Sequence, residues 1–281
     1  MTRRDFLRAM ALATIGGGIT PNIFAQSFEV RRPVLQENLD DNIKDYLHKM
    51  KNFNLPHKDD IKLNTEEYPI FQSALMRLKR LELYAGHGNF QFLGFDEGLR
   101  IARNVSSVGE FSEAELRFLE RIFHEEAARY GFFGEKPLSK LTNQIKEDDV
   151  VKVPYSGNYL YKGLPLDTFN KIKQQLGEQA VLTSGVRGIM KQFSLFLIKA
   201  YQNDGNLSLA SRSLAPPGYS FHGIGDFDVG QVGFGDANFT ELFTTTPVYK
   251  RLSEIGYLSL RYPQENLLGV RFEPWHVKIT T

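Results

Sequence analysis

The stretch SFHGIGDFD, residues 220–228, places a histidine in a glycine-rich turn directly ahead of a short strand that ends in a carboxylate. Near the C-terminus, EPWH at residues 273–276 sets a carboxylate and an imidazole three residues apart, with a proline that stiffens the segment. Two neutral imidazoles and one carboxylate form the protein shell of a catalytic zinc, which keeps one position open for water. The two stretches therefore predict a zinc site built from His222, Asp228 and His276.

A fourth group, not bound to the metal, must take a proton from the attacking water, and Glu273 is the candidate for this general base. The spacing alone leaves a structural interpretation open, in which Asp228 caps a turn and His276 packs in a core. Asp226 is a rival to Asp228 as the carboxylate ligand.

The second half of the chain, in which both stretches lie, alternates short strands with helices. Residues 150–162 predict a strand or hairpin, and residues 180–183 predict a short buried strand. Thr246 and Pro247 predict a helix N-cap followed by proline at the first helical position. Further strands are expected at residues 225–230, 257–261 and 272–279. Residues 150–281 are therefore expected to form an α+β domain with a small antiparallel sheet.

Residues 26–149 predict a mainly helical N-terminal region. The stretch 26–64 is polar and irregular and indicates an extended lead-in. From Thr65 onward, apolar residues recur at spacings of three and four. The stretch SEAE at residues 112–115 is a capping box, and the helix that it starts is expected to end at Gly131.

The first residues resemble an export signal. TRRDFLR at residues 2–8 is similar to the twin-arginine motif, and a weakly apolar segment and a small residue, Ala25, follow it. A basic amphipathic helix is the alternative, although the glycines at 16–18 would break it. We expect residues 1–25 to be a signal peptide recognised by the twin-arginine export machinery. The mature protein is then periplasmic or otherwise exported, with no membrane span.

Composition excludes several classes of protein. The formal net charge of +1 offers no basic field for nucleic acid. The absence of cysteine excludes disulfides, cysteine nucleophiles and thiolate metal sites. A serine peptidase of the penicillin-binding type needs a lysine three residues after its serine, and no serine here has one. His124 cannot belong to a helical zinc motif, because position 128 is Ala128.

Three ordered motifs resemble those of the VanY-type zinc D-alanyl-D-alanine carboxypeptidases, a group of peptidoglycan metallopeptidases. PPGYSFHGIG at residues 216–225, with Asp228 soon after, is similar to the first zinc motif of that family. EPWH at 273–276 is similar to the second motif, and SGVR at 184–187 with Gln192 is similar to an upstream element. The resemblance covers residues 150–281.

The resemblance implies a role for each matching residue. His222, Asp228 and His276 would hold one Zn²⁺ per chain, and Glu273 would be the general base. Arg187 would stabilise the oxyanion or hold the substrate carboxylate, since its planar donors can bind two oxygens. Ser220 and Gln192 would line the substrate peptide; for Ser220 the alternative is a turn residue.

The implied activity is hydrolysis of D-amino-acid-containing peptidoglycan stem peptides, with D,D-carboxypeptidase as the favoured reaction. An endopeptidase, an L,D-carboxypeptidase and a non-catalytic wall-binding protein on the same fold are the alternatives. Two positions depart from the family pattern. Asp228 follows His222 by six residues instead of seven, and Phe221 stands where the family often has glutamate.

Overall fold

The computed structural model describes residues 34–256 and 259–279, with side chains from residue 43 onward. The predicted signal peptide and its cleavage site lie outside the described residues. The chain divides into two units, Met1–His48 and Lys49–Thr281. Among the described residues, no helix combines the length and apolar character needed to cross a lipid bilayer.

Helix α2 spans Val34–Lys51, so the prediction of an irregular lead-in over residues 26–64 was wrong for this segment. Leu35, Leu39, Ile43 and Leu47 recur at intervals of four residues, which is the spacing of one helix face. The many acidic and amide residues between them make the segment polar on average and conceal this pattern.

The unit from Lys49 onward begins with a group of helices. Their bounds are α3 Glu67–Ala85, α4 His87–Phe90, α5 Phe95–Asn104 and α6 Glu113–His124. The capping box is confirmed, because the Ser112 hydroxyl accepts from the Glu115 amide and the Glu115 carboxylate accepts from the Ser112 amide. Helix α6 ends at His124, not at Gly131, because Glu125 and Glu126 adopt extended backbone before a short 3₁₀ turn at Ala127–Tyr130.

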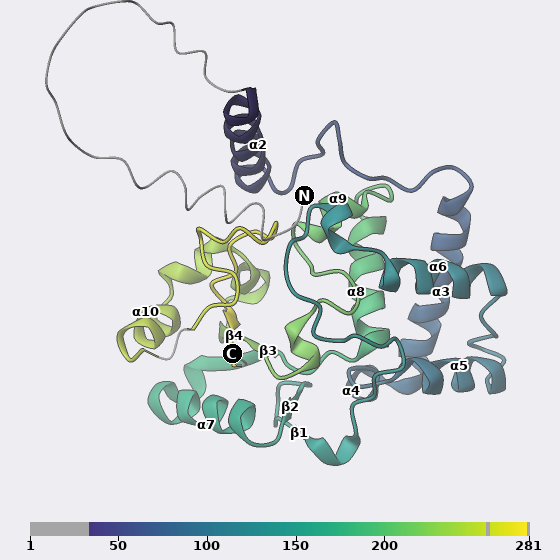
Figure 1. The fold of residues 1–281 in the computed structure, drawn as a ribbon. Coiled ribbons are helices and arrows are strands. Elements are labelled where there is room, and N and C mark those ends of the chain that lie inside the picture. Colours follow the sequence, from purple (N-terminus) through teal and green to yellow (C-terminus); the bar gives the residue numbers. More distant parts are fainter. Residues whose placement is uncertain (1–33, 257–258, 280–281) are drawn as a thin grey trace, which may run out of the picture. The chain divides into compact units, whose positions relative to one another are not determined.

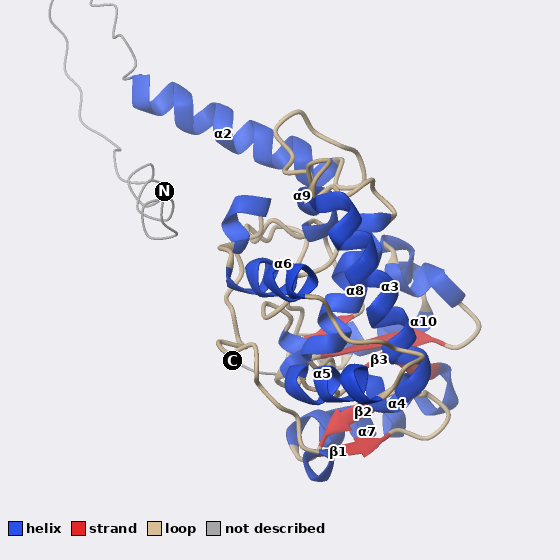
Figure 2. Cartoon of the chain, turned by 90° about the vertical axis from the view of Figure 1, so that its right-hand side faces the viewer, coloured by secondary structure: helices blue, strands red, loops and turns tan. Residues whose placement is uncertain are grey.

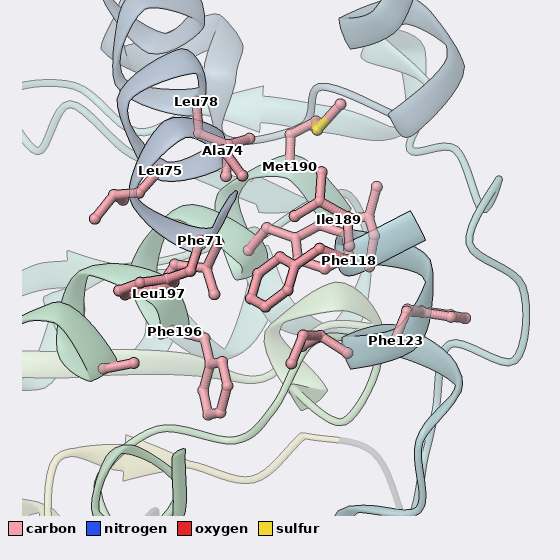
Figure 3. Close-up of a cluster of buried hydrophobic side chains, with 14 of the residues drawn as sticks. Phe71, Ala74, Leu75, Leu78, Phe118, Phe123, Ile189, Met190, Phe196 and Leu197 are labelled. Atoms are coloured by element: carbon pink, nitrogen blue, oxygen red, sulfur yellow. The ribbon is translucent and has the colours of Figure 1, made fainter. Parts of the chain in front are cut away.

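The largest hydrophobic core joins these helices to α8 (Ile189–Tyr201) and α9 (Leu207–Ser211). Figure 3 shows Phe71 and Leu78 of α3, Phe118 of α6 and Phe196 of α8 among the side chains of this core. Helices from both sides of the predicted boundary at residue 149 thus share one core. The division into two domains there stays a prediction.

The α+β fold class is confirmed by two small antiparallel sheets (Figure 2). The first is a hairpin of β1 (Val150–Lys152) and β2 (Tyr159–Tyr161). The second has the order β3-β4-β5, with β3 Ala180–Ser184, β4 Phe227–Gln231 and β5 His276–Val277. The strand predicted at 272–279 is therefore shorter than expected. In the segment predicted as a strand at 257–261, of which 257–258 are not described, Leu260 forms only an isolated bridge with Val277.

Helices α7 (Leu164–Leu176) and α10 (Pro247–Glu254) pack on the three-stranded sheet and enclose a second core around Phe227 and Trp275. In Figure 1 the sheet lies between these two helices and α8. The remaining 3₁₀ turns are Glu147–Asp149, Gly177–Gln179, Phe221–Gly223, Gly235–Phe239 and Glu241–Thr245. Residues 227–230 of the middle strand, β4, are buried, so they belong to the interior of the molecule.

Candidate metal centre and active site

Strand pairing brings two of the predicted ligands together. Asp228 on β4 lies opposite His276 on β5, and Ser184 on β3 lies on the other side of Asp228. His222 sits in the 3₁₀ turn Phe221–Gly223 just before β4. Residues far apart in the sequence therefore meet where β4 begins.

Three ligand atoms converge at this place. The Oδ1 atom of Asp228 lies 3.3 Å from Nε2 of His222 and 3.6 Å from Nδ1 of His276. The three ligand atoms lie within 4.8 Å of one another, and the three residues are buried. Within residues 34–256 and 259–279, His222 Nε2 and Asp228 Oδ1 have no hydrogen-bond partner, a costly state for buried polar atoms. We call this group of three residues the metal centre.

The second nitrogen of each ring is held by the protein. His222 Nδ1 donates to the Gly185 carbonyl at 2.8 Å, because a carbonyl can only accept. His276 Nε2 lies 3.2 Å from Oδ2 of Asp226. These bonds turn Nε2 of one ring and Nδ1 of the other toward Asp228, an arrangement known to orient metal-binding histidines.

Gly185 must be a glycine for this to work. A Cβ atom added there would lie 1.9 Å from the backbone oxygen of Tyr159. The close approach of β2 lets Val186 donate its amide to that same oxygen at 2.8 Å. The glycine therefore fixes the carbonyl that orients His222.

Asp226 is itself held by several donors. Arg261 donates Nε to Oδ2 at 2.8 Å and Nη2 to Oδ1 at 3.2 Å, and the amide of Ile279 donates to Oδ1 at 2.9 Å. The structure thus brings Asp226 to the far side of His276 and brings Asp228 to the side that faces His222.

Charges shift the titration of these groups. Against the effect of burial, the His222 and Arg187 charges lower the pKa of Asp228 to about 2. Burial, with the nearby Arg187 charge, lowers the pKa of His222. For His276 burial acts in the same direction, but the bonds to Asp226 and Glu273 outweigh it and raise the pKa to about 9. The carboxylates of Asp226 and Glu273 thus favour the protonated form of His276.

Glu273 and Arg187 flank the metal centre. Oε2 of Glu273 lies 3.3 Å from Nδ1 of His276, and the residue is 7% exposed. Arg187 donates Nη2 to Oδ2 of Asp228 at 2.7 Å and Nε to the Ser184 hydroxyl at 2.9 Å. Both residues, with Asp228, line a cavity of about 370 Å³. The carboxylate and guanidinium predicted from the sequence are thus placed where a substrate could reach them.

Ser220 and Gln192 are buried and do not line this cavity. The Gln192 side chain donates to the Arg187 carbonyl at 2.8 Å and accepts from the Gly218 amide at 2.9 Å. It therefore joins the start of α8 to the loop that precedes His222. Contact of either residue with substrate stays a prediction.

Sequence reasoning missed Arg261, Lys199 and Arg271. Arg261 holds Asp226, and the other two residues line the cavity. Lys199 lies on α8 among apolar residues, and Arg271 comes two residues before Glu273. The sequence offered one indication of a functional role, the position of Arg271 close to the EPWH stretch, and none for Lys199 or Arg261.

Comparison with known proteins gives one family. Residues 164–280 match the VanY family model, described as D-alanyl-D-alanine carboxypeptidase. None of the curated proteins compared matches this chain significantly.

Similar solved structures share 22–24% identity with this chain. The LdcB LD-carboxypeptidase, solved in a study of peptidoglycan recognition, has 22% identity over 48% of this chain and 69% of its own, with a TM-score of 0.40. A variant of the vancomycin-resistance D,D-pentapeptidase VanY in complex with Zn(II) has 24% identity over 47% and 78%, with a TM-score of 0.36. VanYB in complex with D-alanine-D-alanine has 24% identity over 47% and 77%, with a TM-score of 0.37.

Proposed function

We propose that this chain, whose residues 164–280 match the VanY family model of D-alanyl-D-alanine carboxypeptidases, is a zinc peptidase acting on peptidoglycan stem peptides. D,D-carboxypeptidase activity, the removal of a terminal D-amino acid, is the favoured reaction. One observation carries the proposal: His222, Asp228 and His276 converge, and two of their buried ligand atoms have no hydrogen-bond partner among the described residues.

The donor set fits a catalytic zinc ion. Two imidazoles and one carboxylate match the shell of zinc hydrolases, and the two orphaned atoms would gain a partner on metal binding. One Zn²⁺ per chain would be held by His222, Asp228 and His276. Bound zinc would polarise the peptide carbonyl and lower the pKa of the attacking water.

Glu273 is the proposed general base. It lines the cavity beside the metal centre and would accept a proton from the attacking water, then donate it to the leaving amine. Proton transfer to the amine is needed because an unprotonated amide nitrogen is a poor leaving group. The position of Glu273 next to His276, without a place among the three converging ligand atoms, suits this role.

Arg187 is the proposed electrostatic partner of the reacting carbonyl. Two of its nitrogens hold Asp228 and Ser184, and Nη1 is used in neither contact. Nη1 would stabilise negative charge on the carbonyl oxygen. Gln192 and Ser220, proposed to serve the substrate peptide, would then act from behind the cavity wall, Gln192 through its bonds to Arg187 and Gly218.

The proposed substrate lies outside the cytoplasm, which agrees with the export signal expected at residues 1–25. We propose that the mature protein is periplasmic or otherwise exported and that its partner there is the peptide portion of the cell wall.

The test is digestion of purified muropeptides by the zinc-loaded protein, with and without a chelator, followed by mass spectrometry of the products. Loss of one D-alanine from pentapeptides, abolished by the chelator, is the expected result. Separation of cross-linked dimers would assign an endopeptidase, and loss of D-alanine from tetrapeptides would assign an L,D-carboxypeptidase. A zinc-loaded protein that binds the muropeptides and releases nothing would refute the hydrolase and favour a wall-binding protein.

A further inference from the structure

The cavity that holds Glu273 and Arg187 carries two further cations. Lys199 of α8 and Arg271, which precedes Glu273 in the chain, both line it. Both side chains are partly buried. A partly buried cation normally has an anionic partner, because water no longer stabilises its charge fully.

Arg271 is fixed in place but lacks such a partner. Its guanidinium carbon lies 4.8 Å from the centre of the Trp275 ring and 5.1 Å from that of the Phe53 ring. Its Nε atom is buried and has no hydrogen-bond partner among the residues that the structure describes. In the described part of the chain, Arg271 forms no ion pair; the charges of Glu273, Glu241 and Asp228 act on it only from a longer range.

Lys199 is also without an ion pair among the described residues. Burial, together with the positive charge of Arg271, lowers its pKa. The positive charge of Arg271 thus acts on Lys199 across the cavity that both residues line. Two neighbouring unpaired cations in one cavity are costly for the empty protein and favourable for an anion that enters it.

Lys191 shows that the cations of the cavity wall do not all lack an ion pair. It lies on the same helix and lines the same cavity, but its Nζ atom is 2.8 Å from Oε1 of Glu82. Arg187 is likewise paired, with Asp228 at 2.7 Å. Of the four Lys and Arg side chains that line the cavity, only Lys199 and Arg271 form no ion pair within the described part of the chain.

We propose that Lys199 and Arg271 form a carboxylate-binding subsite that is separate from the metal centre and holds a carboxylate of the substrate peptide. The proposal rests on the proposed peptidase function. A peptide that ends in D-alanyl-D-alanine offers its C-terminal carboxylate, and an acidic residue upstream of the cleaved bond would offer a second one. A guanidinium and an ammonium together can bind either one through charge-assisted hydrogen bonds.

The test uses the full, zinc-loaded protein and three synthetic peptides that end in D-alanyl-D-alanine. The first has a free C-terminus and an upstream D-glutamate, the second has D-glutamine in place of D-glutamate, and the third has a C-terminal carboxamide. For the first peptide, the double variant Lys199→Gln with Arg271→Gln should raise KM about tenfold or more, with kcat nearly unchanged.

The other two peptides identify the carboxylate. The peptide that lacks the bound group should be cleaved with the same KM by the wild type and the double variant. If D-glutamine removes the difference, the subsite binds the upstream carboxylate; if the carboxamide removes it, the subsite binds the C-terminus. An equal loss with all three peptides, or no loss with any, would overturn the proposal.

Three controls keep the result interpretable. Lys191→Gln removes a cation that is already paired, so the discrimination among the three peptides should stay as in the wild type. Arg271→Lys keeps the positive charge, so its KM for the first peptide should stay closer to that of the wild type than the KM of Arg271→Gln does. Lys199→Gln alone tests the subsite if the Arg271→Gln protein does not fold.

Failure of the peptidase proposal would be seen separately. Calorimetric binding of the three peptides to the zinc-loaded Glu273→Ala variant, with and without the Lys199 and Arg271 changes, needs no turnover. If no peptide is cleaved by the wild type but the carboxylate preference in binding is lost on removing the two cations, the subsite stands and the hydrolase does not.

Discussion

The buried pair of Asp60 and Arg212 and the buried metal centre are built from similar charges, yet only the pair is complete within the protein. Arg212 donates to both Asp60 oxygens at 2.7 and 3.0 Å and to the carbonyls of Phe53 and Leu55. In the described part of the chain, the metal centre leaves His222 Nε2 and Asp228 Oδ1 without a hydrogen-bond partner. We call Asp60 and Arg212 the structural ion pair.

The difference indicates what each group does. A buried charge with all its bonds made holds the chain in one conformation, while buried polar atoms left unsatisfied cost stability unless a ligand completes them. The structural ion pair joins the segment after α2 to α9, and the metal centre lies beside a cavity. We therefore expect changes in the pair to alter stability and changes around the metal centre to alter metal binding and turnover.

The largest expected effect is on turnover. Glu273→Ala should lower kcat by about a hundredfold to ten-thousandfold, because the general base is lost, while zinc stays bound to its three ligands. Peptide hydrolysis and metal analysis measure the two properties on one sample. Glu273→Gln keeps the size of the side chain and should be similarly inactive; a zinc-replete Glu273→Ala protein that turns over normally would contradict the role.

The next largest effect is expected on stability, from a change in the structural ion pair. Asp60→Ala leaves the Arg212 guanidinium buried without a counter-charge and should lower the free energy of unfolding by about 3–5 kcal/mol. Urea unfolding measures this loss, and zinc affinity should not change. The neighbouring Asp59 is the matched control: its pair with Lys49 is exposed, so Asp59→Ala should cost at most about 1 kcal/mol.

A smaller effect is expected at Asp226, which supports the metal centre from behind. Asp226→Asn weakens the acceptor that orients His276 and should lower zinc affinity about tenfold to a hundredfold. Competition with a chelator of known affinity measures the change. A folded variant with wild-type zinc affinity would mean that the backbone alone orients the ring.

Four side chains of the proposed active site could be predicted from the sequence: His222, Asp228, Glu273 and His276. Each lies in a short motif with a recognisable residue order. The two motifs also fall where β4 and β5 pair, so local structure and the long-range contact agree. The contact of Asp226 with His276 could not be predicted. It depends on which ring nitrogen faces inward, and Arg261, which holds Asp226, lies in a segment with little regular structure.

Helices α3, α6 and α10 were predicted from apolar spacing and capping residues, and the strands of the three-stranded sheet were predicted near their places, whereas α7 was not predicted. Helix α2 was missed because its average composition is polar, and the early end of α6 was missed because Glu125 leaves the helix without a proline or glycine. The subsite residues Lys199 and Arg271 were also beyond reach. Their significance lies in the absence of a partner, which no single-sequence pattern encodes.

The smallest expected effect is the pH dependence of the structural ion pair. Against the effect of burial, bonds to Arg212, His57 and Asn206 lower the pKa of Asp60 from 3.8 to about 2. A carboxyl with a lower pKa in the folded state stabilises the protein fully above its unfolded pKa and loses that contribution as the pH falls toward its folded pKa. The stability difference between wild type and Asp60→Asn should therefore be constant at about pH 5 and shrink between about pH 4 and pH 2, as measured by urea unfolding. A difference that stays constant through this range would mean that the charge of Asp60 contributes nothing beyond its hydrogen bonds.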